Sequence, residues 1–398
     1  MKRIGKMWVA ALAVASLTLA ARSSLAADPI VFGYIDDLSG LVAEAGNDSL
    51  NGVKVAVEEY NATAAAKTRP IKLVVYDGKV DAQLTSTLAT RAIEDDKAVA
   101  IFGGNVSGSV PGVIALANDM KVPFFSMSAA ADNFTSPSTP YFFRFGPSNS
   151  QDAAAVANLI AQSGFKRVGI INVSLPFGLD GASAITAALK TRGINVVTNQ
   201  VYEVNATDVS PQVLKTREAN PDVIVVWPYP ADGGRVLRTM AQQNIKTPTI
   251  IARVALFDTF RQLAGEAANG VLVPNTVDTQ RADVKAMLAK FAKAHGERPP
   301  TMYIAMGYDG AKAAIKALAD RKVVAALDAN NLAAARVALR DAVETGGSVG
   351  SLQGSAGNTL KFSPGNHQAL QGDKLFVWAQ VQGGKLIKAD LKAFAAKK

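Results

Sequence analysis

Hydroxyl, amide and backbone N–H groups gather in one glycine-rich segment of the chain. Residues Gly103–Ser109 follow an apolar run and precede Pro111, which is typical of the first turn of a helix. Free N–H groups at a helix N-terminus, with hydroxyls beside them, favour a bound anion. Asn105 and Ser107 are therefore candidate ligand-binding residues. The alternative is that Ser107 or Ser109 only caps the helix.

The residue types that carry metal and enzyme chemistry do not gather in this way. The chain has no cysteine, and its two histidines, His295 and His367, lie in unrelated segments. No HExxH, GxxxxGK[ST] or GxGxxG motif is present, and Ser107 lies three residues after Gly104 rather than the two of a nucleophile elbow. We therefore expect no metal, no cofactor and no enzymatic activity.

The first 26 residues have the pattern of a secretory signal peptide. Basic residues occur at positions 2, 3 and 6, residues 7–20 are uncharged and largely apolar, and Ser24 and Ala26 supply small residues for cleavage before Ala27. A membrane anchor is the alternative, but roughly 20 apolar residues are needed to span a bilayer. The absence of cysteine excludes disulfides and a lipidated N-terminal cysteine. We expect an exported protein that diffuses freely in the periplasm.

Charge and composition exclude a nucleic-acid partner. The formal net charge is +9, but the basic residues are scattered, and aromatic residues make up 7% of the chain. A nucleic-acid surface needs a basic stripe with interleaved aromatic residues, and no such stripe is present.

Apolar runs and amphipathic segments alternate along the chain. The Val- and Ile-rich runs are typical of strands buried on both faces of a parallel sheet, and alternating strands and helices predict the α/β class with doubly wound parallel sheets. The expected strands are Ile30–Ile35, Ile71–Tyr76, Ala98–Phe102, Val122–Phe125, Val168–Val173, Val223–Trp227 and Thr249–Ile251. The expected helices are Asp48–Asn61, Asp81–Asp95, Gly112–Met120, Ser150–Ser163, Gly181–Thr191 and Gly234–Gln243.

These elements fall into two similar sets. Residues 30–127 form one set and residues 165–254 the second, with a linker near Phe145–Ser148. Residues 284–345 are helical without new strands, and the tail from 360 to 388 has a β pattern, so the chain returns to sheets already built. Two lobes joined by more than one crossover imply a hinge and a cleft. Ligands bind at the carboxyl ends of strands in such sheets.

Most of the chain after residue 26 resembles the type I periplasmic binding proteins of the branched-chain amino acid transporter group. The matching segments, in order, are Asp37–Gly40, Leu50–Val53, Ile101–Gly104 with Ser107, Val122-Pro123 with Ser126, Tyr141–Arg144, Phe177-Gly178, Ala264–Gly270 and Gly307–Asp309. The resemblance implies three crossovers forming the hinge, with lobe I at 27–147 plus 275–355 and lobe II at 148–274 plus 356–398. It also implies a monomer that closes on a small molecule and delivers it to the permease of an ABC transporter.

The resemblance also implies roles for residues of the first lobe. It assigns contacts with the ligand's carboxylate to Ser107. A threonine hydroxyl of the family shares this role near Ala130, and we carry it to Ser128 with backbone help from Ala129 or Ala130. The alternative for Ser128 is a turn serine that bonds its own backbone.

Aromatic residues are expected on the other wall of the cleft. Phe177 matches a tyrosine of the family, Tyr229 ends a predicted strand, and Tyr303 precedes a predicted helix. Rings of this kind bury much area and shape a pocket. Phe177 is equally well explained as a core residue.

Arg253 departs from the family pattern. It falls where the amino-acid binders carry a glutamate that pairs with the ligand's ammonium group, and an arginine would repel that group and pair with a carboxylate instead. Ala45 replaces a bulky tryptophan and suggests space for a larger ligand. We therefore expect a positively charged cavity for a small organic acid, aromatic acids included. Three alternatives remain: an ion pair of Arg253 with a neighbour such as Asp258, a branched-chain amino acid or amide ligand, and a ligand-sensing regulatory domain.

Overall fold

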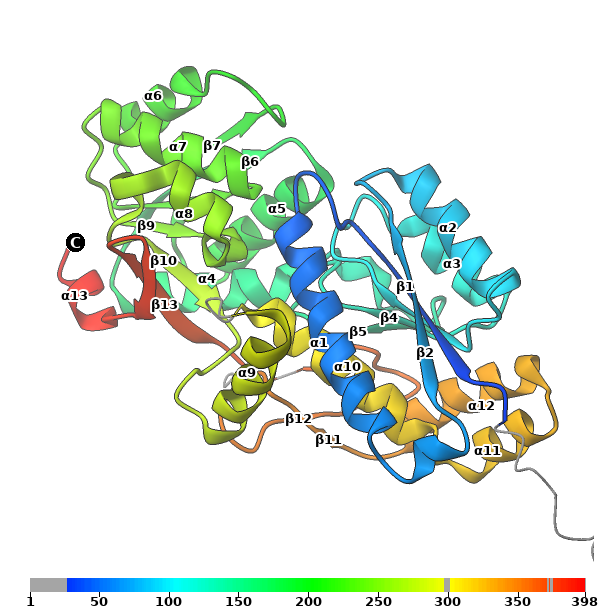
Figure 1. Cartoon of the computed structure of the whole chain (residues 1–398). Helices are drawn as coiled ribbons and strands as arrows, with labels where there is room; N and C mark the ends of the chain where they lie inside the picture. The colour runs from blue at the N-terminus through cyan, green and yellow to red at the C-terminus, as the bar shows by residue number, and fades with distance from the viewer. Residues whose placement is uncertain (1–26, 297–300, 371, 373–374, 398) are drawn as a thin grey trace, which may run out of the picture.

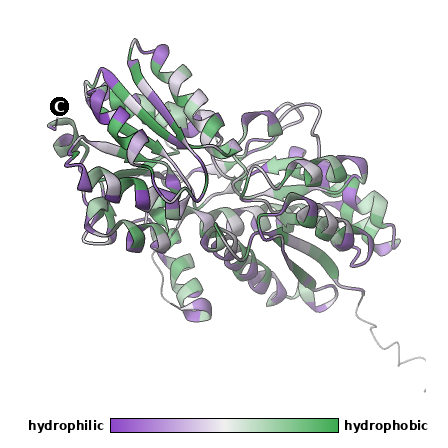
Figure 2. Ribbon diagram, turned by 90° about the horizontal axis from the view of Figure 1, so that it is seen from above, coloured by the Kyte–Doolittle hydropathy of each residue, from purple (hydrophilic) through white to green (hydrophobic). Residues whose placement is uncertain are grey.

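The computed structural model describes residues 27–296, 301–370, 372 and 375–397, so the predicted signal peptide lies outside the described residues. Two α/β lobes lie side by side, each built on its own sheet (Figure 1). Apolar residues concentrate on the strands and the inner faces of the helices, whereas polar residues lie mainly on the outside (Figure 2). The predicted fold class is confirmed: two lobes with parallel sheets.

In the described part of the chain, five strands form the first sheet, in the order β2-β1-β3-β4-β5, and all of them run parallel. They are β1 (Ile30–Asp36), β2 (Ile71–Asp77), β3 (Ala100–Gly103), β4 (Phe124–Ser126) and β5 (Phe142–Arg144). Helices α1 (Ala43–Asn61) and α10 (Met302–Ala317) cover one face, and α2 (Ala82–Glu94) and α3 (Pro111–Asp119) cover the other. Strands β1, β3, β4 and β5 are almost entirely buried and mostly apolar, as expected of a sheet covered on both faces, whereas the edge strand β2 is partly exposed.

Seven described strands form the second sheet, in the order β14-β13-β10-β9-β8-β6-β7. They are β6 (Arg167–Val173), β7 (Asn195–Tyr202), β8 (Val223–Trp227), β9 (Thr249–Ile251), β10 (Leu272–Asn275), β13 (Val377–Gln382) and β14 (Lys385–Lys388). Strands β6 to β10 are parallel, and β13 and β14 add an antiparallel edge. The flanking helices are α4 (Asn149–Gln162), α5 (Pro176–Lys190), α6 (Ser210–Glu218), α7 (Pro230–Gln242) and α8 (Asp258–Ala264).

The other described elements complete the two lobes. Near the first lobe lie α9 (Ala282–His295), α11 (Arg321–Asp328), α12 (Leu332–Thr345) and the β11 (Val349–Gly350) and β12 (Thr359–Leu360) pair, and α13 (Leu391–Ala395) ends the chain beside the second sheet (Figure 1). The 3₁₀ turns are η1 (Ala65–Lys67), η2 (Asp132–Phe134), η3 (Arg253–Leu256) and η4 (Gly265–Ala268). No described helix combines the length and the apolar character that crossing a membrane requires.

The chain passes between the two sheets three times. It leaves the first sheet after β5, returns after β10 to form α10, and enters the second sheet again at β13. Two of these passages are hydrogen-bonded, because the backbone of Arg144 pairs with that of His367 and Ala369 (2.9 Å each). The N–H of Gly354 likewise donates to the carbonyl of Thr276 (2.6 Å). The three-crossover hinge that the resemblance implied is therefore present.

Helices α1 and α10 approach each other backbone to backbone. A Cβ added at Gly52 would collide with the carbonyl of Ile304, and one added at Gly307 would collide with the carbonyl of Ser49. Glycine is therefore required at both positions because there is no room for a side chain. This contact fixes the relative position of the helices that carry Ala45 and Tyr303.

Four described strands were absent from the sequence prediction: β5, β7, β10 and β11. Strand β7 is an edge strand with polar and exposed positions, so it lacks a continuous apolar run. β5 and β10 include an arginine or a proline within three or four residues, and β11 has only two residues.

Candidate functional site

A small cavity lies where the carboxyl ends of the two sheets face each other. Its volume is about 30 Å³, which is room for roughly two water molecules. The segments after β3, β4, β8 and β9 line it together with residues of α1, α5 and α10. The lining includes these residues singled out from the sequence: Ala45, Asn105, Ser107, Ser128, Phe177, Tyr229, Arg253 and Tyr303. Ala129 and Ala130 are buried beside Ser128 but do not line the cavity.

Arg253 reaches from the second lobe to the first. It opens η3, directly after β9, and its side chain is 2% exposed. Its Nη1 donates to Oγ of Ser128 (2.9 Å), which follows β4 of the first sheet, and its Nη2 donates to the carbonyl of Pro147 (3.3 Å) in the first crossover. Its Nε is buried without a hydrogen-bond partner among the described residues. The guanidinium therefore ties both lobes and the hinge together, and its Nε–H remains without a hydrogen-bond partner among the described residues.

Asp152 corrects the expected charge of the cavity. This residue of α4 forms a buried ion pair with Arg253, and both side chains are 2% exposed. The alternative of an ion pair at Arg253 is therefore confirmed, but the partner is not the suggested Asp258, which pairs with Arg261. Arg253 thus lines the cavity, but its charge is balanced by Asp152. The expectation of a positively charged cavity did not take this acid into account.

The local electrostatics around Asp152 reflect burial more than charge. Desolvation raises the pKa of Asp152, and the neighbouring charge of Arg253 opposes that rise. One carboxylate oxygen, Oδ1, is buried without a hydrogen-bond partner among the described residues. The pair therefore offers one unused acceptor and, at Nε of Arg253, one unused donor.

The hydroxyl of Ser107 bonds across the first lobe instead of capping a helix. Helix α3 begins at Pro111 after Val110, and no side chain caps it. Oγ of Ser107 accepts the N–H of Ala130 (3.0 Å), and Ser109 lies 3.5 Å from Asp37. The capping alternative was therefore wrong for both serines. The proton of the Ser107 hydroxyl stays available to a ligand.

The backbone after β4 is already hydrogen-bonded. The N–H groups of Ser128 and Ala129 donate to the carbonyl of Gly104 (3.4 and 3.0 Å), and that of Ala130 donates to Ser107. A ligand would have to displace one of these bonds to use the backbone of Ala129 or Ala130. Oγ of Ser128 bonds Arg253 rather than its own backbone, so the turn-serine alternative was wrong.

Arg144 positions the wall that carries Ser128. It ends β5 and is 2% exposed. Its guanidinium donates to the carbonyls of Ala129 (3.3 Å) and Ala131 (2.7 Å) and to the hydroxyl of Thr135 (3.0 Å), and its Nε donates to Gln368 (2.5 Å) of the third crossover. Burial, with the charge of Arg253 close by, lowers the pKa of Arg144 to about 10. This residue therefore couples the cavity wall to the hinge.

A buried acid lies beneath Asn105. Oδ1 of Asp36 accepts the N–H groups of Asp37 (2.9 Å) and Asn105 (3.1 Å), and its Oδ2 accepts Nδ2 of Asn105 (2.5 Å). Nδ2 of Asn105 also lies 3.2 Å from Oγ of Ser49 on α1. Burial, followed by the charge of Asp37, raises the pKa of Asp36 to about 7. Asp36 thus holds Asn105 at the edge of the cavity.

Aromatic rings form most of the remaining wall. The ring of Phe177 lies 5.8 Å from that of Tyr229 and 5.8 Å from the guanidinium of Arg253, and Phe257 lies 4.9 Å from Tyr303. Burial raises the pKa of Tyr303 to about 12 and that of Tyr229 well above its usual value. Both hydroxyls are therefore neutral donors. The rings and Arg253 surround the cavity so closely that Ala45 adds no large open volume.

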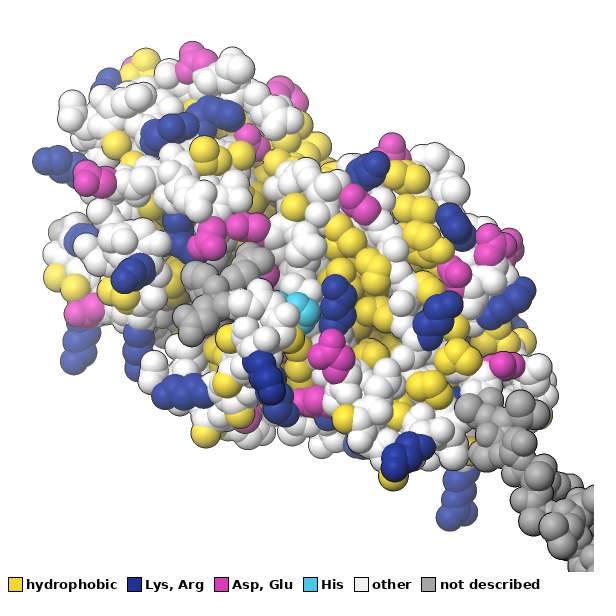
Figure 3. All heavy atoms as spheres, in the orientation of Figure 1, with side chains coloured by type: hydrophobic (Ala, Val, Ile, Leu, Met, Phe, Trp, Pro, Cys, Tyr) yellow, Lys and Arg dark blue, Asp and Glu magenta, His cyan; other side chains and the backbone are white. Residues whose placement is uncertain are grey.

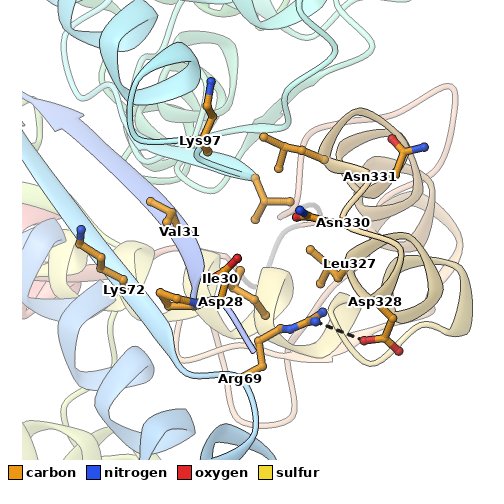
Figure 4. A pocket seen from close by; sticks show the side chains of 13 residues that line it. Asp28, Ile30, Val31, Arg69, Lys72, Lys97, Leu327, Asp328, Asn330 and Asn331 are labelled. Atoms are coloured by element: carbon orange, nitrogen blue, oxygen red, sulfur yellow. Dashed lines mark ion pairs between the residues drawn. The ribbon is translucent and has the colours of Figure 1, made fainter. Parts of the chain in front are cut away.

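A larger hollow, of about 770 Å³, lies at the amino ends of the first sheet, away from the cleft (Figure 4). Three basic residues border it, but Arg69 pairs with Asp328 (3.2 Å), and the chains of Lys72 and Lys97 point away from its centre. Asp28 adds a further negative charge. The charged groups around this hollow therefore do not converge on one point. Basic and acidic side chains are likewise mixed over the face of the molecule shown in Figure 3.

Comparisons with known proteins agree with this architecture. Residues 29–385 match the model of a family described as periplasmic binding protein. A relative from Brucella abortus, "Leu/Ile/Val-binding protein homolog 7", is 26% identical over 327 residues, which cover 77% of this chain and 81% of that protein.

Two solved structures share the fold. The substrate-binding protein LivJ of Streptococcus pneumoniae, in complex with isoleucine, has a TM-score of 0.78 at 21% identity, over 90% of this chain and 97% of that one. A solute-binding protein of Rhodopseudomonas palustris, in complex with benzoate, has a TM-score of 0.77 at 20% identity, over 90% and 95%. Because the family match covers most of the residues, the chain is a member of the periplasmic binding protein family.

Proposed function

We propose that this protein is a periplasmic receptor for a small organic carboxylate, which it delivers to the permease of an ABC importer without chemical change. The single observation that carries this proposal is the guanidinium of Arg253, buried in the cavity between the lobes and bonded to Ser128 of the opposite lobe. The N-terminal segment would direct export to the periplasm.

The ligand class follows from the groups that remain unused. Nε of Arg253 is a buried charged donor without a partner among the described residues, and the hydroxyls of Ser107 and Tyr229 lie in the same lining. A carboxylate accepts such donors well, and hydrogen bonds to charged groups are about twice as strong as neutral ones. The phenyl and phenol rings in the lining suit a ligand with an apolar or aromatic body, and benzoate, the ligand named in the Rhodopseudomonas palustris complex, is such a molecule.

A second candidate is a branched-chain amino acid. The names of the relatives and the isoleucine complex favour it, and the unpartnered Oδ1 of Asp152 could accept an ammonium group. The guanidinium of Arg253 lies beside that oxygen, however, and a second cation there would be repelled. We therefore rank the carboxylate first.

The mechanism we infer is closure of the lobes on the ligand. Contacts come from both lobes, so only a closed form can make all of them, and the ligand shifts the open–closed equilibrium by its preference for that form. The lobes would move as the units 27–147 with 275–355 and 148–274 with 356–398. The cavity of about 30 Å³ is smaller than such a ligand, so opening at the hinge must precede binding.

Calorimetric titration of the purified mature protein with benzoate and with leucine tests the proposal. We expect heat of binding with benzoate and a much weaker response to leucine. Tight binding of leucine with no response to benzoate or other organic acids would overturn it in favour of the amino acid candidate. Solution scattering should show compaction when the ligand is added, because closure reduces the radius of gyration.

A further inference from the structure

The side-chain oxygen of Asn105 is a hydrogen-bond acceptor without a partner in the cavity lining. Oδ1 of Asn105 is buried and has no hydrogen-bond partner among the described residues, and Asn105 lines the cavity. Buried polar atoms without a partner are uncommon in folded proteins. The atom therefore marks a place where a bound molecule can supply a donor.

The amide cannot turn to present its nitrogen instead. Nδ2 of Asn105 lies against the Asp36 carboxylate (2.5 Å) and near Oγ of Ser49 (3.2 Å). Above the pKa of Asp36, which is about 7, that carboxylate is an acceptor only. Exchanging O and N would place two acceptor oxygens in contact, so Asn105 presents its oxygen to the cavity.

The position of this acceptor is separate from that of Arg253. Asn105 follows β3 and leans towards β1 through Asp36, whereas Ser128, the partner of Arg253, follows β4. Strands β3 and β4 are adjacent in the sheet, and adjacent strands are about 4.8 Å apart, so the segments that carry the two polar groups leave the sheet about one strand spacing apart. A benzene ring with substituents on opposite or alternate carbons spans a distance of this order.

We infer that the cavity recognises a hydroxylated carboxylic acid, with the carboxylate at Arg253 and a hydroxyl donor at Oδ1 of Asn105. This inference rests on the proposed function and adds a specificity residue to it. An acid without the hydroxyl would leave Oδ1 of Asn105 unpaired and would lose affinity for that reason. A methyl group in place of the hydroxyl keeps the size of the ligand and removes only the donor.

The test is a calorimetric comparison at pH 8 of 3- and 4-hydroxybenzoate with 3- and 4-methylbenzoate, using the mature protein. We expect one hydroxy acid to bind roughly 10- to 100-fold more tightly than its methyl counterpart. Asn105→Leu should reduce this preference to a few-fold. The matched control, Ser49→Ala, removes a neighbour of Nδ2 but leaves Oδ1 in place and should keep the preference.

The outcomes separate this inference from the proposed function. Binding of the methyl acids as tightly as the hydroxy acids by the unsubstituted protein would overturn the role of Asn105 and leave the carboxylate proposal standing. An unchanged preference in Asn105→Leu would also overturn it. If none of these acids binds, both ideas fail. The comparison of ligands in the unsubstituted protein decides the question even if Asn105→Leu does not fold.

Discussion

The buried pair of Arg253 and Asp152 allows a structural role to be separated from a role in ligand binding. In Arg253→Gln the carboxylate of Asp152 stays buried without its counter-charge. Breaking a buried ion pair in this way costs about 3–5 kcal/mol of the free energy of unfolding. The double variant Arg253→Gln, Asp152→Asn replaces the charged pair by two neutral amides. We expect it to recover most of that loss.

The expected effect on affinity is smaller and follows from the hydrogen bonds of Arg253. Nη1 and Nη2 are already bonded to Ser128, Pro147 and Asp152, so Nε is the donor left for a ligand. One hydrogen bond to a charged group contributes about 1.5–3 kcal/mol, which corresponds to roughly a 10- to 150-fold change in Kd. We therefore expect the double variant to be stable but to bind benzoate more weakly by this factor.

Urea unfolding measures the stability, and calorimetric titration with benzoate measures the affinity. The control is Arg261→Gln, Asp258→Asn, which removes an ion pair of the second lobe that does not line the cavity. The control should change stability modestly and leave the Kd unchanged. A stable double variant that binds benzoate as tightly as the unsubstituted protein would refute a ligand-binding role for Arg253.

Two further predictions concern the scaffold. Gly307→Ala should lower the free energy of unfolding by about 1–3 kcal/mol or more in urea titrations, because the added Cβ would collide with the carbonyl of Ser49. The control Gly365→Ala, which has open space around the added Cβ, should be nearly neutral. Equal effects of the two substitutions would argue against the close contact of α1 and α10. Burial raises the pKa of Asp309 to about 6 from 3.8, so the folded state binds this proton more tightly than the unfolded state does. As the pH rises from about 4 to about 6, the free energy of unfolding should therefore fall, relative to that of Asp309→Asn, by up to about 1.4 kcal/mol per pH unit. Above about pH 6 it should fall no further. Urea unfolding of both proteins at pH 4, 6 and 8 measures this difference, and a gap that stays constant would contradict the shift.

The fold class could be predicted from the sequence because strands and helices leave local patterns of apolar residues. Runs such as Val223–Trp227 are apolar on every residue, and β8 occupies exactly that buried place in the second sheet. The edge strand β7 carries no such run and could not be predicted in this way. The order of the strands within each sheet depends on contacts between distant segments, which periodicity does not contain.

Most residues of the cavity lining were singled out from the sequence, but their hydrogen bonds and ion pairs were not. Glycine, serine and aromatic residues at strand ends marked the lining residues, because the carboxyl edge of a parallel sheet gathers them. The partner of Arg253 was missed because Asp152 lies about one hundred residues earlier and in another element. A signal did exist: Asn149, Asp152 and Val156 share the buried face of α4, and a charged residue on such a face requires a partner.

The role of Arg144 was also beyond the sequence, although the residue belongs to a segment that resembles the family. Its four partners lie on the loop after β4 and on the third crossover. Arginine at the end of a short strand has no periodic pattern that would indicate those bonds. Only the folded chain shows that one guanidinium joins the cavity wall to the hinge.

The backbone contact between α1 and α10 limits how this periplasmic binding protein could adapt to other ligands during evolution. Gly52 and Gly307 already bring the two helices as near as main chains allow, so the helices cannot come closer around a smaller molecule. Changes in the accommodated size must then come from single side-chain replacements, at Ala45 or Tyr303 for example, because each of these lines the cavity from one of the paired helices. Related receptors that keep both glycines can diverge in what they carry while the frame of the first lobe stays the same.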